Sequence, residues 1–298
     1  MNAIIVTNCT SRKRIKPGKS LEAPSQLEGE SVEKYARRWI EYAQTHSVQV
    51  VPEDLYCSRG YGEAIRAAQK LGADIYTVSA GFGLLTNQHT IPPYNFTLTD
   101  LYKITDTLDD WWRAINLARE SRDILTEIIM DESIDLALIS ISTSYMRLIE
   151  TELLNLPERA LKKLRLVIGY EPPTSLEKFA IKYDSRLDGP NSPIRGTRAD
   201  FNSRALHHFV ENVVLKTNDH SIENHKDFAN ALLEPMIPLS APKRQKATDE
   251  EIKALIEKNW RESGGRSGSA LRLLRDKAGV ACEQGRFSKL FRQVMAAQ

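Results

Sequence analysis

The stretch AIIVTNCTSRK, residues 3–13, decides the fold. Its first five residues predict a buried strand, and a polar loop follows at once. Similar apolar runs predict strands at 48–51, 74–79, 136–141 and 164–168. Amphipathic patterns predict helices between or after them, at 31–45, 61–71, 109–130, 200–214 and 222–233. Apolar strands that alternate with helices are typical of a mostly parallel sheet with helices on both faces, so we expect an α/β fold.

Composition narrows the class of protein. The 298 residues are 41% hydrophobic and 27% charged, which is ordinary for a globular protein. No apolar run is long enough to cross a bilayer, and the first residues do not resemble a secretory signal, so we expect no membrane partner. Three cysteines are too few and too scattered for a disulfide framework, which favours a cytoplasmic location. The sequence gives no signal for an oligomeric state.

Charge and proline content divide the chain into parts. We expect an α/β domain at 1–216, a linker with one short helix at 217–246, and a basic helical domain at 247–298. Residues 241–298 hold 13 Lys and Arg against 7 Asp and Glu, whereas the rest of the chain is slightly acidic. Two helices around Gly279 predict a helix-turn-helix-like piece that binds nucleic acid, and dimerisation or packing is the alternative. The outward residues of the second helix would be Gln284, Arg286, Lys289 and Arg292.

Ligands of open α/β sheets bind outside the carboxyl ends of the strands. Three such loops are rich in glycine, hydroxyl or amide groups, and they begin at Asn8, Ser79 and Ser142. Strand-to-helix turns favour the same residues, so the alternative is simple turns. The first loop also carries cations that suit phosphate or a solvated surface, namely Arg12, Lys13, Arg14, Lys16 and Lys19. The third loop adds Ser144 and Tyr145 as candidate base contacts.

The second loop, SAGFGLLTNQHTIPPYNFTLTD at 79–100, contains aromatic residues behind two prolines. A rigidly held Tyr94, or Phe82, would suit stacking on a base, and Ser79 lies beside them. Asp100 could stabilise a sugar cation or orient water, although a helix cap is the alternative. Asp200 is the second candidate carboxylate, also in a cap position.

Two arginines precede Asp200 and could clamp a phosphate, Arg195 and Arg198. No metal motif is present, and no histidine is identifiable as a base for Cys9. We therefore expect neither a metal nor another cofactor.

Several of these motifs occur together in one known family. Cys9-Thr10-Ser11-Arg12-Lys13, then SAGFGLL, then IPPYNFTL resembles an unassigned bacterial and phage family with a C-S-K start, S-A-K-Y-G-L-L and P-Y-x-x-T-L. The resemblance covers residues 4–100, and Gly81 and Phe82 replace its usual Lys and Tyr. The family is remotely similar to uracil-DNA-glycosylase-like folds. The resemblance implies a base-handling pocket and extends to antiphage DNA glycosylases that excise glucosylated hydroxymethylcytosine.

These observations favour a DNA glycosylase that flips a modified base into a pocket and hydrolyses the N-glycosidic bond, in antiphage defence. Asn8 and Ser144 would bind the base edge, and Asn8 joins Asp100 and Asp200 among the catalytic candidates. The alternatives are a base-exchange or nucleoside transferase and a non-catalytic sensor of modified nucleic acid or nucleotide.

Overall fold

The computed structural model describes residues 1–14, 21–120, 124–240 and 244–296. The chain divides into two compact units, Met1–Leu239 and Ser240–Gln298, which we call unit 1 and unit 2. In the described part of the chain, no helix is long and apolar enough to cross a membrane.

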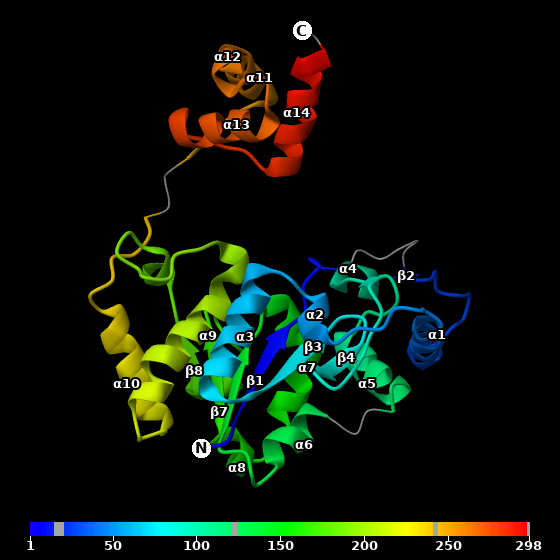
Figure 1. Ribbon diagram of the computed structural model, residues 1–298. Coiled ribbons are helices and arrows are strands. Elements are labelled where there is room, and N and C mark those ends of the chain that lie inside the picture. Colours follow the sequence, from blue (N-terminus) through cyan, green and yellow to red (C-terminus); the bar gives the residue numbers. More distant parts are fainter. Residues whose placement is uncertain (15–20, 121–123, 241–243, 297–298) are drawn as a thin grey trace. The chain divides into compact units, whose positions relative to one another are not determined.

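Unit 1 is built on a six-stranded sheet with the order β4-β3-β1-β6-β7-β8 (Figure 1). Every neighbouring pair is parallel except β3 and β4, which are antiparallel. The predicted α/β class is therefore confirmed. The strands are β1 (Ala3–Asn8), β3 (Asp74–Ser79), β4 (Gly83–Thr86), β6 (Leu136–Ser140), β7 (Leu164–Ile168) and β8 (Ala180–Lys182). The short strands β2 (Leu21–Glu22) and β5 (Tyr94–Asn95) form a separate parallel pair.

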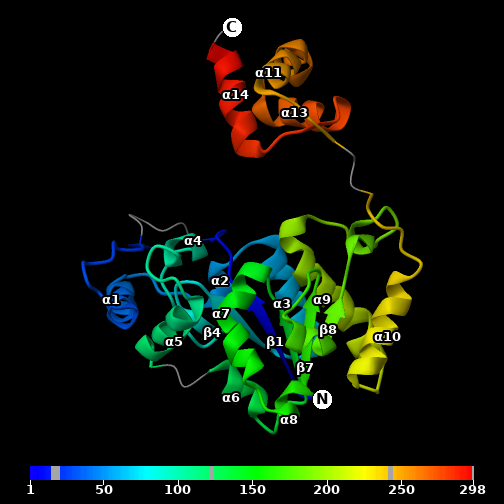
Figure 2. The ribbon, with the colours of Figure 1, turned by 180° about the vertical axis from the view of Figure 1, so that it is seen from behind.

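Helices cover both faces of this sheet because alternate residues of each strand point to opposite sides. In β1, Ile4 and Val6 belong to one hydrophobic core, whereas Ala3 and Ile5 belong to the other. Figure 2 shows the face that carries α7, opposite the face with α3 and α9 in Figure 1. The helices are α1 (Val32–Gln44), α2 (Pro52–Leu55), α3 (Arg59–Leu71), α4 (Leu98–Leu101), α5 (Leu108–Ala118), α6 (Leu125–Met130), α7 (Thr143–Leu154), α8 (Glu158–Leu161), α9 (Phe201–Asn212) and α10 (Ile222–Leu233).

Three expectations about unit 1 need correction. Residues 48–51 form no strand, and only Val50 makes an isolated bridge, with Ile91. The helix predicted at 109–130 is two helices, because α5 ends before Glu120, whose φ of 52° is left-handed and interrupts a helix. Unit 1 also continues beyond 216: α10 contacts β8 and contributes the buried Leu233 to the core. The short helix expected in a linker is thus part of unit 1.

Unit 2 has its own hydrophobic core. Its helices are α11 (Asp249–Lys258), α12 (Trp260–Ser263), α13 (Ser267–Arg272) with a π-helical continuation at Leu273–Lys277, and α14 (Gln284–Ala296). Thr248 and Glu251 form the capping box that begins α11. The strands β9 (Gln245–Lys246) and β10 (Val280–Ala281) pair in parallel. Apolar residues from α11, α13 and α14 meet in the centre, including Ile252, Leu274, Phe287 and Phe291.

Candidate functional site

A cleft of about 590 Å³ lies where β1 and β6 end. Its walls come from the loop after β1, the start of α3, Ser142 just before α7, the segment that leads into α9 and the first turn of α9. They comprise residues 8–12, 58–61, 142, 197–200, 202 and 203. The strand order reverses at β1: β3, the next strand of the sheet along the chain, lies on one side of β1, and β6, which comes after β4, lies on the other. Such a switch point is where open α/β sheets bind ligands, so the cleft is the candidate site.

Positive electrostatic character dominates the rim of the cleft. The helices α3 and α7 begin at its wall, capped by Ser58 and Ser142, and α9 begins beside them. Helix N-termini carry partial positive charge and unpaired N–H groups that favour anions. The guanidinium groups of Arg12 and Arg198 line the cleft as well, and both residues are exposed. Neither makes a side-chain hydrogen bond or ion pair within the described residues, so both are free to bind an anion.

Asn8 lines the cleft, but its amide already has partners. Its Oδ1 accepts a hydrogen bond from the backbone N–H of Ser142 at 3.0 Å. Its Nδ2 donates to the carbonyl of Cys9 at 2.8 Å. The side chain therefore joins the loops after β1 and β6. Its position supports a role in holding the cleft's shape better than the predicted role in reading a base.

Asp200 is the carboxylate that lines the cleft, and it is 5% exposed. Its Oδ1 accepts hydrogen bonds from Arg204 Nε at 2.6 Å and from the Thr197 N–H at 2.9 Å. Its Oδ2 lies 3.7 Å from Arg59 Nε. Burial by itself raises the pKa of Asp200, but the hydrogen bonds from Arg204 and Thr197 outweigh it and the pKa is lowered. Asp200 is thus ionised at neutral pH.

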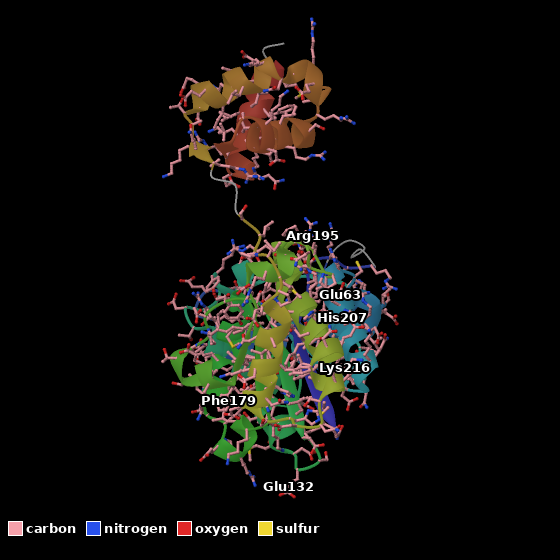
Figure 3. All side chains as sticks on the ribbon, turned by 90° about the vertical axis from the view of Figure 1, so that its left-hand side faces the viewer. Glu63, Glu132, Phe179, Arg195, His207 and Lys216 are labelled. Carbon is pink, nitrogen blue, oxygen red and sulfur yellow. The ribbon has the colours of Figure 1, made fainter. Side chains whose placement is uncertain are left out.

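A charge network continues from the cleft between α3 and α9. Arg59 Nε lies 3.7 Å from Glu63 as well as from Asp200, and its Nη2 donates to the carbonyl of Arg195 at 2.9 Å. Glu63 also contacts His207 Nδ1 at 2.7 Å (Figure 3). These contacts fix Arg59 at the wall of the cleft. The carbonyl of Arg195 takes part in this, while its exposed side chain lies outside the cleft lining.

The lining of the cleft includes a buried thiol, Cys9, with a tyrosine side chain behind it. Cys9 is 5% exposed, and its Sγ lies 3.1 Å from the hydroxyl of Tyr145. Tyr145 therefore supports the floor and does not line the cleft as a base contact. Lys13 Nζ lies 4.1 Å from the centre of the Tyr94 ring, and burial lowers the pKa of Lys13. Of the predicted basic loop, Lys16 and Lys19 lie outside the described residues.

The aromatic side chains predicted to stack on a base are in the core, which corrects that prediction. Tyr94 and Phe82 are 1% and 3% exposed, and their ring centres are 4.8 Å apart. The Tyr94 hydroxyl bonds to Ser79 Oγ at 2.8 Å, so Ser79 is equally buried and serves packing. Trp39 Nε1 donates to the carbonyl of Gly81 at 2.6 Å. Neither ring offers a free face to a ligand.

In the segment 79–100, Gly81 and Gly83 lie where a larger side chain would not fit. A Cβ on Gly81 would lie 3.0 Å from Tyr94 Cε2, and one on Gly83 would lie 2.2 Å from Asn116 Oδ1. Gly83 also has a φ of 65°. Their small size permits close packing against α5 and the aromatic core.

Asp100 and Ser144 are also away from the cleft. Asp100 closes a capping box with Thr97 at the start of α4, and its Oδ1 accepts from Lys103 Nζ at 2.9 Å. The capping alternative therefore holds, and Asp100 is not a cleft carboxylate. Ser144 is exposed on α7 outside the lining, whereas Ser142 is part of it.

The predicted contact residues of unit 2 are all exposed on α14, as expected: Gln284, Arg286, Lys289 and Arg292. Arg286 differs from the others because it already has partners. It lies 2.6 Å from the carboxylate of Asp249 and donates to the carbonyl of Ala247 at 3.0 Å. Arg286 therefore joins α14 to the start of α11.

Sequence reasoning missed the wall formed by residues 58–61. The pattern predicted a helix from Tyr61, but α3 begins at Arg59, because Ser58 Oγ accepts from the Tyr61 N–H at 3.1 Å. The available signal was Ser58 followed three residues later by an amphipathic helix.

Residues 43–137 match a family of unknown function, DUF6884. The matched segment runs from the end of α1 to the start of β6 and includes Ser58–Tyr61 of the cleft wall. No curated protein and no solved structure matches the chain. Within the described residues, no group of three or more His, Cys, Asp or Glu side chains could hold a metal ion.

Proposed function

We propose that the protein is a DNA glycosylase that hydrolyses the N-glycosidic bond of a modified nucleotide in the cleft at the ends of β1 and β6. One observation carries the proposal: the ionised carboxylate of Asp200 lies in the same 590 Å³ cleft as Arg12 and Arg198, two cations whose side chains have no partner in the described part of the chain. A flipped nucleotide has phosphates that need cations and a sugar that develops positive charge when its base leaves.

The phosphates on either side of the flipped nucleotide would bind at the rim. Arg12 and Arg198 would pair with them, aided by the N-termini of α3 and α7. Since both arginines are exposed and unpaired within the described residues, binding a phosphate breaks no existing ion pair. This arrangement makes the affinity strongly dependent on salt concentration.

Asp200 would stabilise the sugar cation and orient the attacking water. Its lowered pKa makes it a fixed negative charge at neutral pH and unsuited to act as a general acid. Its Oδ1 is occupied by Arg204 and Thr197, so the less engaged Oδ2 would face the sugar. The hydroxyl groups of Thr10 and Ser142, which line the cleft, would bind the base edge.

The substrate class we propose is DNA with a modified base, in antiphage defence, in line with the family resemblance of residues 4–100. The test is to incubate the protein with phage DNA that contains glucosylated hydroxymethylcytosine and to measure abasic sites and released base. Asp200→Asn keeps the shape of the side chain and removes its charge, so base release should fall at least a hundredfold. Asp100→Asn is the matched control, and its activity should stay within about twofold of the parent.

The folded state of Asp200→Asn needs its own check because Arg204 is fully buried. Arg204 keeps a second carboxylate, Asp188, at 2.8 Å, so circular dichroism of the variant should match the parent. Arg12→Ala and Arg198→Ala provide an independent test, because both residues are exposed and unpaired within the described residues. Each should weaken substrate binding. Equal base release by the parent and Asp200→Asn would refute the assignment of the carboxylate.

A sensor without catalysis is the second candidate function. It is favoured by the two hydrogen bonds that already occupy Asp200 Oδ1. A sensor would retard modified DNA and release no base, whereas a base-exchange enzyme would incorporate an added base. The same incubation distinguishes all three outcomes.

A further inference from the structure

The helix α14 of unit 2 has two distinct faces. Phe287, Leu290, Phe291 and Val294 are buried in the core of unit 2. Gly285, Lys289, Arg292 and Gln293 are exposed, and their spacing of four, three and one residues places them along one side of the helix. We call these four residues the α14 stripe. It is a polar and basic ridge that the core of unit 2 does not use.

Within the described residues, no acid forms an ion pair with either cation of the α14 stripe. Lys289 has no ion pair within the described residues, and Arg292 Nε donates only to the carbonyl of Ser288 in its own helix, at 3.2 Å. Three other cations of unit 2 do have acidic partners: Arg286 with Asp249, Lys277 with Glu262 and Arg244 with Asp276. The stripe thus offers its charge to an external anion.

The aromatic residues of unit 2 exclude one class of nucleic acid. Single-stranded DNA and RNA are usually held by stacking of their bases on exposed aromatic rings. Residues 240–298 contain only three aromatic residues. Phe287 and Phe291 are buried, and Trp260 stacks on Phe291 with ring centres 5.3 Å apart. Unit 2 therefore lacks the stacking surface that single strands require.

Because the α14 stripe lies on an α-helix, it suits a DNA duplex better than an RNA duplex. An α-helix fits the major groove of B-form DNA, which is about 12 Å wide. The major groove of A-form RNA is too narrow for side chains on a helix to read. We infer that unit 2 binds double-stranded DNA, with α14 in the major groove. Lys289 and Arg292 contact phosphates or guanine edges, and the amide of Gln293 on the same side of the helix is placed to read a base.

This inference shares with the proposed function only the expectation that the partner is nucleic acid. Unit 2 would bind duplex DNA, with or without sequence preference, and this binding does not depend on the reaction in the cleft of unit 1. It also gives Arg286 a different role from its neighbours, since Arg286 holds α14 to α11 and does not contact DNA.

The experiment uses the full chain and fluorescence anisotropy with three labelled probes of one sequence without modified bases: a 20-base-pair DNA duplex, the single DNA strand and the RNA duplex. We expect the DNA duplex to bind at least tenfold more tightly than either other probe. Lys289→Ala and Arg292→Ala should each weaken duplex binding roughly tenfold and lower the salt dependence by about one phosphate contact. Lys258→Ala, an exposed cation at the end of α11, is the matched control and should change affinity less than twofold.

Several results would overturn the inference. These are a preference for the single strand or the RNA duplex, unchanged affinity in the combined Lys289→Ala and Arg292→Ala variant, or an equal loss in Lys258→Ala. Both stripe residues are exposed, and circular dichroism of the full chain verifies that the variants stay folded. If the parent releases no base yet prefers duplex DNA through α14, the proposed function fails alone, and the reverse result refutes only this inference.

Discussion

The buried pair Arg165 and His225 predicts that unit 1 loses stability in mild acid. His225 is fully buried, and its Nδ1 accepts a hydrogen bond from Arg165 Nε at 3.1 Å. An acceptor nitrogen must be unprotonated. Burial above all, then the charges of Arg165 and His220, lower the pKa of His225 to about 4, although Asp219 acts in the opposite direction. Protonation would bury a second cation beside Arg165 and remove the hydrogen bond.

The size of the effect follows from the difference between the two pKa values. Between the ordinary value of 6.5 and about 4, the unfolded chain binds a proton at His225 that the folded chain does not. The free energy of unfolding therefore falls as the pH falls through this window, and the contribution is fully present above pH 6.5. At about 1.36 kcal/mol for each unit, the total loss is about 3 kcal/mol.

The assay is urea unfolding at several pH values between 7.5 and 4, followed by tryptophan fluorescence. Trp260→Phe as the background restricts the signal to the three tryptophans of unit 1. His225→Gln is the comparison, because glutamine can accept from Arg165 but does not titrate. Other groups, including His208, whose pKa burial also lowers, affect both proteins alike. The parent should lose about 3 kcal/mol more than His225→Gln over this range, and identical pH profiles would refute the reasoning.

Three further predictions concern packing, thiol reactivity and α14. Gly83→Ala should lower the free energy of unfolding by about 2–4 kcal/mol, because its Cβ would meet Asn116 at 2.2 Å in a left-handed backbone. Gly72→Ala has the same φ range but open space, so a loss above about 2 kcal/mol there would contradict this account. Cys57 is the exposed thiol, so a chromogenic disulfide should modify one cysteine rapidly and two slowly. Arg286→Ala should lower the free energy of unfolding of unit 2 by up to about 1 kcal/mol, measured by urea unfolding with Trp260 fluorescence. An unchanged value would show that the ion pair between Arg286 and Asp249 does not stabilise unit 2.

The central strands of unit 1 were predictable because a strand that is buried on both faces appears in the sequence as a continuous apolar run. The runs at 74–79 and 164–168 coincide with β3 and β7, and 222–233 coincides with α10. The edge strands β4 and β8 escaped prediction because they are only four and three residues long. The strand predicted at 48–51 was wrong because short apolar segments also occur where a chain packs beside a sheet without pairing.

The place of the candidate site was more predictable than its members. Asn8 and Ser142 follow strands that end at one edge, so the fold rule alone brings them together. The aromatic loop failed because a sequence motif does not say which way a ring points. Its Tyr94 faces Trp39 and Phe82 in the core. The choice between Asp100 and Asp200 depended on tertiary position, because both form the same capping box in sequence.

The position of β1 in the centre of the sheet has a consequence for synthesis of the chain. Residues 3–8 leave the ribosome before their partners on the two sides, which are residues 74–78 and 136–140. At typical translation speeds, the second partner follows on the order of ten seconds later. For that interval an apolar strand has one or both edges open, so a chaperone that binds residues 3–8 should protect the nascent chain from aggregation.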